Sequence, residues 1–194
     1  MSGGHAEVPV AARVRQLEER LISAGLVTDA ELDEILTQVY DSASPVNGAR
    51  MVVRAWTDPA YHDRLLADAN AAAAELGFGP GTRGYLLKAV ENTPGVHNVI
   101  VCTLCSCYPT SLLGPSPSWY KSFAYRSRVV REPREVLAEF GLELPEDTEI
   151  RVWDANSETR YLVLPQRPPG TDDKDEEALV SLVTRNGLIG TAAC

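Results

Sequence analysis

The sequence predicts an α+β fold, in which an N-terminal helical arm precedes a layered α-β-β-α domain. Three observations predict this class. Apolar residues recur at helical spacing at both ends of the chain, and four short β-branched runs lie between them. Turn signals separate these runs. Residues 1–48 are predicted to form the arm and residues 49–194 the layered domain, which holds all four cysteines.

The arm is predicted to contain two amphipathic helices within residues 10–42. Gly25 is typical of a helix end, and Thr28 opens the second helix as a capping box with Glu31. The apolar positions of the two helices include Val10, Val14, Leu17, Ile35 and Leu36. An apolar stripe of this kind is typical of an arm that packs on a partner subunit, and a helical hairpin folded on its own domain remains the alternative.

The layered domain is predicted to begin after Pro45 and Gly48, which separate it from the arm. Asp58 and Pro59 open a helix that continues to about residue 76. Further elements follow in the order strand 85–91, turn 92–95, strand 96–101, loop 114–118, helix 132–140, strand 148–154, strand 159–164 and helix 174–185.

Composition excludes several classes of partner. The chain has 194 residues and a formal net charge of −9, so it repels nucleic acid. It has no polybasic run, no signal peptide and no apolar stretch of transmembrane length, which predicts no membrane contact and a cytoplasmic location. Disulfides rarely persist there, so clustered cysteines favour a metal site or redox chemistry.

Three of the four cysteines, Cys102, Cys105 and Cys107, lie within six residues directly after a predicted strand. Thiolates are ligands for zinc, copper(I), iron–sulfur clusters and low-spin iron or cobalt. A structural zinc site with His97 as fourth ligand remains open. A thioredoxin-like site is disfavoured, because its first cysteine would begin a helix.

A second arrangement uses the backbone as well as sulfur. Cys105, Ser106 and Cys107 can present two sulfurs and two amide nitrogens to one ion, and Cys102 can bind as an axial thiolate. A sixth position then stays open, as in catalytic metal sites.

The segment Cys-Thr-Leu-Cys-Ser-Cys at 102–107 resembles the metal-binding motif of cobalt-type nitrile hydratase α subunits. The iron type is similar but has Ser where this chain has Thr103. The resemblance extends over residues 15–190, with similar segments at 54–59, 91–94, 119–122, 125–134 and 160–168. It implies the nitrile hydratase α-subunit fold.

The resemblance implies one non-corrin Co(III) per chain, with iron less favoured. Cys102 would be the axial thiolate, Cys105 a sulfinic acid and Cys107 a sulfenic acid, with the Ser106 and Cys107 nitrogens as further ligands. The reaction would add water to a nitrile to give an amide, with the ion as Lewis acid or the Cys107 sulfenate oxygen as nucleophile.

The resemblance also implies partners. The ligand charges sum to about −5, so a trivalent ion leaves about −2, which requires cations nearby. In the family a β subunit, present as one chain or two, supplies arginines, and an accessory protein loads the metal. Ser106 would hydrogen-bond a tyrosine of the partner, and Arg160 would meet the β subunit near the site.

Two departures from the family pattern concern the substrate pocket. The family has Gln where this chain has Arg83, and a Trp-Pro pair where it has Thr110 and Ser111. Loss of an indole frees the space of a side chain that buries about 150–250 Å². If this position lines the pocket, the substrate is expected to be large and polar, such as the nucleoside nitrile of the toyocamycin nitrile hydratase branch. The alternative is sequence drift at a position that does not touch the substrate.

Two other functions remain open. Thiocyanate hydrolase shares the motif at 102–107 but converts thiocyanate to carbonyl sulfide and ammonia, and a non-catalytic zinc-binding module would leave the cysteines unoxidised. The basic stretch Arg126, Arg128, Arg131 and Arg134 is interpreted as an interface, or as surface pairing with the chain's own carboxylates.

Overall fold

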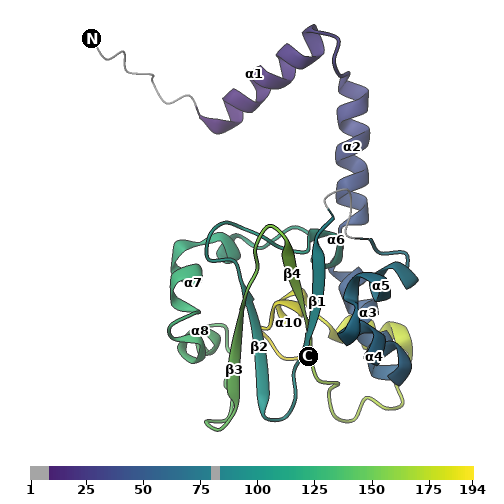
Figure 1. Cartoon of the computed structure of the whole chain (residues 1–194), viewed down its shortest axis with the longest axis vertical. Helices are drawn as coiled ribbons and strands as arrows, with labels where there is room; N and C mark the ends of the chain where they lie inside the picture. Colours follow the sequence, from purple (N-terminus) through teal and green to yellow (C-terminus); the bar gives the residue numbers. More distant parts are fainter. Residues whose placement is uncertain (1–8, 80–83) are drawn as a thin grey trace. The chain divides into compact units, whose positions relative to one another are not determined.

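The computed structural model describes residues 9–79 and 84–194, with only the backbone described for residues 38–41 (Figure 1). The chain divides into two compact units, one ending at Asp41 and the other running from Ser42 to Cys194. Helices and small sheets together confirm the α+β class.

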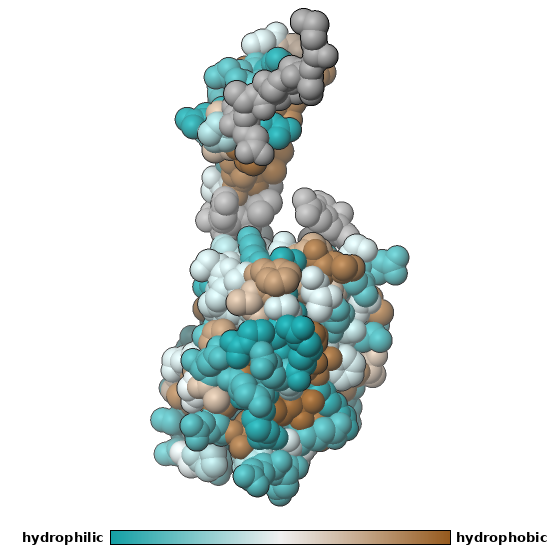
Figure 2. Space-filling model, turned by 90° about the vertical axis from the view of Figure 1, so that its left-hand side faces the viewer, coloured by the Kyte–Doolittle hydropathy of each residue, from teal (hydrophilic) through white to brown (hydrophobic). Residues whose placement is uncertain are grey.

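The first unit holds the two predicted helices, α1 (Val10–Ser23) and α2 (Asp29–Ser42). The capping box is confirmed, because Thr28 N donates to Glu31 Oε2 at 2.8 Å and Glu31 N donates to Thr28 Oγ1 at 3.2 Å. No residue of α1 is buried. Figure 2 shows hydrophobic surface on these helices.

The separation predicted at Pro45 and Gly48 is wrong, since both residues belong to helix α3 (Pro45–Thr57). Pro45 stands in the first turn, where its missing N–H costs nothing, and Ser44 caps the helix by accepting from Val46 N. Gly48 is buried, and an added Cβ would lie 2.8 Å from Leu112 O. Glycine here permits a close approach of the backbones rather than a break.

The helix predicted from residue 59 to about residue 76 is divided into α4 (Pro59–Ala67) and α5 (Ala69–Glu75). Asp58 caps α4 as predicted, by accepting from Ala60 N and Tyr61 N. Asp68 has extended backbone and accepts from Ala71 N, so it ends one helix and caps the next. A polar residue that competes for the backbone therefore interrupts a run of good helix formers.

The four predicted strands are confirmed as β1 (Leu86–Glu91), β2 (Val96–Val101), β3 (Glu149–Asp154) and β4 (Thr159–Leu164). They form two parallel pairs, β1 with β4 and β2 with β3. β2 also contacts β4, and in Figure 1 the strands follow one another in the order β3, β2, β4, β1. Because β2 and β3 are parallel and in register, Val101 pairs with Asp154 and both strands end at the same edge.

Short helices surround the strands. They are α6 (Thr110–Leu113), the 3-10 helix η2 (Ser118–Lys121), α7 (Phe123–Arg128), α8 (Pro133–Glu139), α9 (Glu176–Leu182) and α10 (Arg185–Ile189). The helix expected at 174–185 is thus shorter and followed by a second one, whose cap Gly190 has φ +90°. No helix in the described part of the chain is long and apolar enough to cross a bilayer.

Aromatic side chains pack beside the end of β2. Trp119 lies edge-on to Tyr125, with ring centroids 4.9 Å apart, and to Phe140, at 4.6 Å. Tyr120 and Tyr125 are buried. This rigid cluster supports the loop that follows β2.

Candidate metal centre

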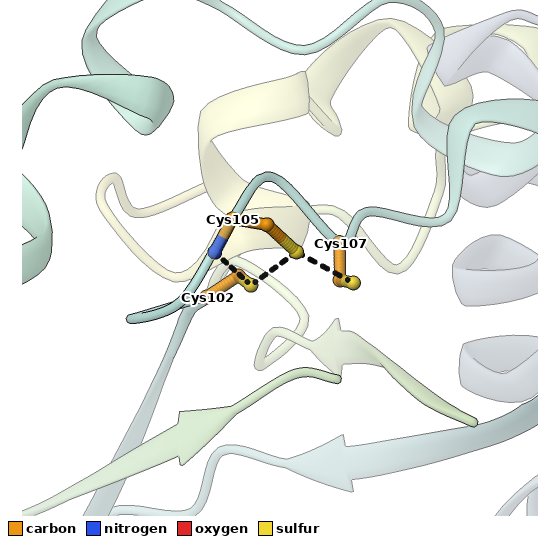
Figure 3. Close-up of side chains that lie close together, drawn as sticks. All are labelled: Cys102, Cys105 and Cys107. Atoms are coloured by element: carbon orange, nitrogen blue, oxygen red, sulfur yellow. Dashed lines mark hydrogen bonds between the residues drawn. The ribbon is translucent and has the colours of Figure 1, made fainter. Parts of the chain in front are cut away.

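The three clustered cysteines follow the end of β2 and turn their sulfurs toward one another (Figure 3). Cys105 Sγ lies 3.3 Å from Cys102 Sγ and 3.1 Å from Cys107 Sγ, and all three sulfurs lie within 4.8 Å of one another. Cys102 is fully buried, Cys107 half-buried and Cys105 exposed. The predicted cluster therefore forms, with one open side.

Backbone N–H groups also face this cluster. Cys105 N donates to Cys102 Sγ at 3.2 Å. Interactions with the Cys107 and Cys102 thiols, and further hydrogen bonds from the Ser106 and Cys107 N–H groups, lower the pKa of Cys105 to about 7. Burial, followed by the bond to Cys105, raises the pKa of Cys107 to about 12, while Arg160 lowers it. The nitrogens of residues 106 and 107 thus point inward beside the sulfurs.

This donor set fits one six-coordinate ion better than a tetrahedral one. Ligands at right angles, with metal–sulfur bonds of ~2.3 Å, lie about 3.3 Å apart, whereas tetrahedral ligands lie about 3.8 Å apart. The two observed sulfur separations, 3.3 Å and 3.1 Å, match the right-angle value. Soft thiolates and inward nitrogens from one loop could hold a low-spin transition metal.

The zinc site considered with His97 does not form. His97 stands near the start of β2, five residues before Cys102, and both its ring nitrogens are already engaged. Its Nε2 lies 2.7 Å from Gly190 O and its Nδ1 3.2 Å from Asn92 Nδ2. Among the described residues, the metal-ligating cluster consists of the three cysteines alone.

Asp154, at the end of β3, anchors the loop from one side. Thr103 N donates to Asp154 Oδ1 at 2.9 Å, and Thr103 Oγ1 donates to Asp154 Oδ2 at 2.6 Å. Ala155 N continues the ladder by donating to Val101 O at 2.7 Å. Parallel strand ends therefore bring a carboxylate to the cysteine loop, and sequence reasoning missed this residue although both strands were predicted.

Residues 118–128 hold the loop from the other side. Tyr120 OH donates to Cys107 O at 3.0 Å. Arg126 Nη1 donates to Thr103 O at 3.4 Å and to Cys105 O at 3.3 Å. No local sequence signal assigns these two residues to the site, because the contacts depend on how α7 packs.

Arg160, Tyr85 and Ser111 lie in one neighbourhood. The Arg160 guanidinium lies 5.2 Å above the Tyr85 ring, and Tyr85 OH lies 3.3 Å from Ser111 Oγ. Thr110 is exposed at the start of α6. Arg83 lies outside the described residues, and Ser106 is exposed on the loop.

Fold and site together define a metal-binding α+β protein whose thiolate site is open on one side. The family model for the alpha chain of nitrile hydratase matches residues 8–192. The chain belongs to this family.

Similar proteins of known sequence include nitrile hydratase and thiocyanate hydrolase subunits. The chain is 52% identical over 182 residues to the cobalt-containing nitrile hydratase subunit alpha of Pseudonocardia thermophila, covering 93% of this chain and 89% of that one. It is 42% identical over 186 residues to the thiocyanate hydrolase subunit gamma of Thiobacillus thioparus, covering 91% and 76%.

Solved structures agree. A double mutant of the Fe-type nitrile hydratase from Comamonas testosteroni Ni1 superposes with a TM-score of 0.89 at 44% identity, covering 94% of this chain and 89% of that one. A recombinant thiocyanate hydrolase with partially modified cobalt centers gives 0.87 at 40% identity, covering 96% and 90%. The predicted α-subunit fold is confirmed.

Proposed function

We propose that this chain is the metal-bearing subunit of a cobalt nitrile hydratase, which hydrates a nitrile to the amide. The observation that carries the proposal is the convergence of three sulfurs in one loop, with a backbone N–H donating to one of them. Cys102, Cys105 and Cys107 would bind the ion through sulfur, and Ser106 and Cys107 through nitrogen. When bound, the ion supplies Lewis-acid chemistry.

The proposal assigns Co(III) to this site. Cobalt is supported by the relatives, two of which are cobalt-containing nitrile hydratase subunits at 52% and 50% identity. An Fe-type enzyme is among the structural neighbours, so metal analysis of the purified complex decides between the two ions.

The exposure of each cysteine supports the proposed oxidation states. Cys105 is exposed, Cys107 is half-buried, and Cys102 is fully buried. Oxidation requires access to the sulfur, so this order favours sulfinic acid at Cys105, sulfenic acid at Cys107 and an unmodified thiolate at Cys102. Ser106, exposed beside them, would position reacting groups through its hydroxyl.

The proposed enzyme includes a β-type subunit as one chain or two. The loaded site would carry an excess charge of about −2 with the Asp154 carboxylate beside it, and partner arginines would add to the positive charges of Arg126 and Arg160. Arg160 would meet that subunit near the site, the N-terminal arm would pack on it, and an accessory protein would load the metal onto the catalytic domain. Free cysteines support a cytoplasmic location, where disulfides are rare.

The proposed substrate is bulky and polar, such as a nucleoside nitrile of the toyocamycin type. Support comes from small residues at Thr110 and Ser111 and from the hydroxyls of Tyr85 and Ser111, 3.3 Å apart, which can recognise polar groups. Arg83 would line the same pocket. Turnover of a nucleoside nitrile should exceed that of acrylonitrile, and Thr110→Trp should reduce the former selectively. Preference for acrylonitrile would contradict this assignment.

The decisive experiment combines intact mass, metal analysis and activity on the chain purified with its partner. We expect one cobalt per chain, three added oxygen atoms and an amide product. Carbonyl sulfide and ammonia from thiocyanate would instead identify a thiocyanate hydrolase. This second function is considered because a thiocyanate hydrolase subunit is 42% identical to the chain. Zinc with unoxidised cysteines would contradict both enzymes.

Cysteine variants test the ligands. Cys105→Ala and Cys107→Ala should each abolish cobalt binding and lower the activity at least ~100-fold, because each deletes a ligand. Cys194→Ala is the matched control, since Cys194 lies outside the cluster and should keep both. Full cobalt in Cys105→Ala would overturn the proposal.

A further inference from the structure

The outer side of the cysteine loop is hydrogen-bonded by a single neighbouring segment, residues 118–128. Tyr125 OH donates to Ile100 O at 2.6 Å, just before the loop. The carbonyls of residues 103 and 105 accept from Arg126, and that of residue 107 accepts from Tyr120. The carbonyl side of the loop is therefore held from outside, while the three sulfurs turn toward one another and Cys105 N donates to Cys102 Sγ (Figure 3).

Arg126 differs from Arg128 in having no carboxylate partner among the described residues. Arg128, two residues later in α7, is bound by Glu132 and by Glu139, the latter at 2.7 Å and 2.9 Å. Arg126 Nε is buried and has no hydrogen-bond partner in the described structure. The chain has a net charge of −9, yet no described carboxylate pairs with this guanidinium. Its positive charge therefore acts on the loop carbonyls.

The acceptor that matters most is Cys105 O. It belongs to the same peptide group as Ser106 N, one of the nitrogens proposed to bind the ion. A peptide that binds through nitrogen carries part of its negative charge on oxygen, and a cation 3.3 Å from that oxygen stabilises it. The positive charge of Arg126 also offsets part of the excess negative charge, about −2, of the loaded metal site.

We propose that Arg126 is a positioning residue of the metal centre. With Tyr120 it holds the carbonyl side of the loop 102–107, so that the ligand atoms converge, and its charge stabilises the loaded loop. The inference rests on the proposed function, since it requires that the loop bind a metal ion.

The test uses the full chain in complex with its partner, loaded with cobalt. Three variants are compared with the wild type: Arg126→Gln, Arg126→Lys and the control Arg128→Gln. Two readouts are cobalt release to a chelator and the position of the sulfur-to-cobalt charge-transfer band. Groups that orient metal ligands contribute about 10–100-fold to metal affinity, so Arg126→Gln should release cobalt about 10–100-fold faster.

The band separates charge from mere support of the loop. Loss of the cation should raise electron density on the ligands and shift the band of Arg126→Gln to longer wavelength. Arg126→Lys keeps the charge and should keep the band, with an intermediate release rate. Arg128→Gln should match the wild type in both readouts, because its partners are carboxylates away from the loop.

The outcomes are distinguishable. A wild-type complex without a transition metal overturns the proposed function and this inference together. A wild type that holds cobalt, with Arg126→Gln equal to it in release rate and band position, overturns the inference alone. Should Arg126→Gln fail to assemble, Tyr120→Phe and Arg126→Lys decide, since the first removes only the hydroxyl on Cys107 O. An unchanged rate of cobalt release in both variants would overturn the inference about Arg126.

Discussion

Thr103 links the cysteine loop to β3 through both its backbone and its side chain. Its N–H and hydroxyl occupy the two carboxylate oxygens of Asp154, at 2.9 Å and 2.6 Å. Thr103→Val preserves shape and the N–H bond but removes the hydroxyl bond. We expect the free energy of unfolding to fall by about 1 kcal/mol, measured by denaturant titration.

Serine keeps the hydroxyl, so Thr103→Ser should stay near wild-type stability. In a double-mutant cycle, Asp154→Asn and Thr103→Val should couple by about 0.5–1 kcal/mol, because they remove the same bond. Additive effects would show that the hydroxyl bond contributes nothing.

His97 is held in its neutral form by its hydrogen bonds. Nε2–H donates to Gly190 O, so Nδ1 accepts from the Asn92 amide, whose oxygen is fixed by two donors of Asn98. Burial lowers the pKa of His97, although the bond to Gly190 O opposes this. A proton at Nδ1 would face another donor and cannot be accommodated without breaking this network.

The pH dependence of stability follows from that pKa. Below about pH 6.5 the unfolded chain binds a proton at His97 that the folded chain excludes. The stabilisation is therefore complete above that pH and is lost as the pH falls toward the folded pKa. The free energy of unfolding should decrease between pH 7 and 5, and His97→Gln should make this decrease shallower.

His62 provides the control with the opposite sign. Its hydrogen bond to Glu91, at 2.8 Å, raises the pKa of His62. Its contribution is therefore complete below about pH 6.5 and is lost as the pH rises through the folded pKa. His62→Gln should leave the acid-side loss in place or steepen it. An unchanged slope in His97→Gln would contradict the assignment.

At the scale of elements, the structure confirms the predictions that depend on signals within a few residues. Strands β1 to β4 and the capping box of α2 were predicted because alternation and cap chemistry are local. Helix α3 was not predicted, because Pro45 and Gly48 are also typical of a linker. Their actual roles depend on the Ser44 cap and on the close packing against Leu112. Tertiary context overrode a correct local rule.

The same distinction applies to the site. The cysteine cluster was predicted from spacing, since all its donors lie within six residues. Asp154 and Arg126 reach the loop across 51 and 23 positions in sequence, respectively. Their roles depend on strand register and on the packing of α7, which no local pattern encodes.

Gly48 in α3 tests the close packing of helices. An added Cβ would meet Leu112 O and Leu188 Cδ1, both at 2.8 Å, and the carbonyl belongs to a backbone that cannot easily shift. Overpacking costs about 1–3 kcal/mol and outweighs the gain of about 1 kcal/mol in helix propensity. Gly48→Ala should lower the melting temperature of the chain.

Gly95 is the matched control, because a Cβ there meets nothing within 4 Å. Gly95→Ala should leave the melting temperature within about 2 °C of the wild type. A Gly48→Ala variant as stable as Gly95→Ala would show that α3 and α6 can move apart without cost.

On the scale of the whole molecule, the chain is an incomplete enzyme. Its cysteine site is open on one side, its net charge is −9, and the loaded site would hold an excess of about −2. An acidic subunit with such a site gains from association with a partner that brings arginines, both by electrostatic attraction and by closing the site to water.

The N-terminal helices would give that partner an apolar surface. The exposed fractions of Val10, Val14 and Leu17 in α1 are 72%, 56% and 58%, although apolar side chains of an amphipathic helix are normally covered.

Burial of two such side chains contributes at least ~3 kcal/mol, which corresponds to about 100-fold in affinity. Val14→Glu combined with Leu17→Glu should weaken association with the β-type subunit by that factor in titration calorimetry. The matched control, Gln16→Glu combined with Ser23→Glu in the same helix, adds the same two negative charges without an apolar loss and should bind nearly as well as the wild type. Equal weakening by both variants would assign the effect to charge, and no weakening by either would remove α1 from the interface.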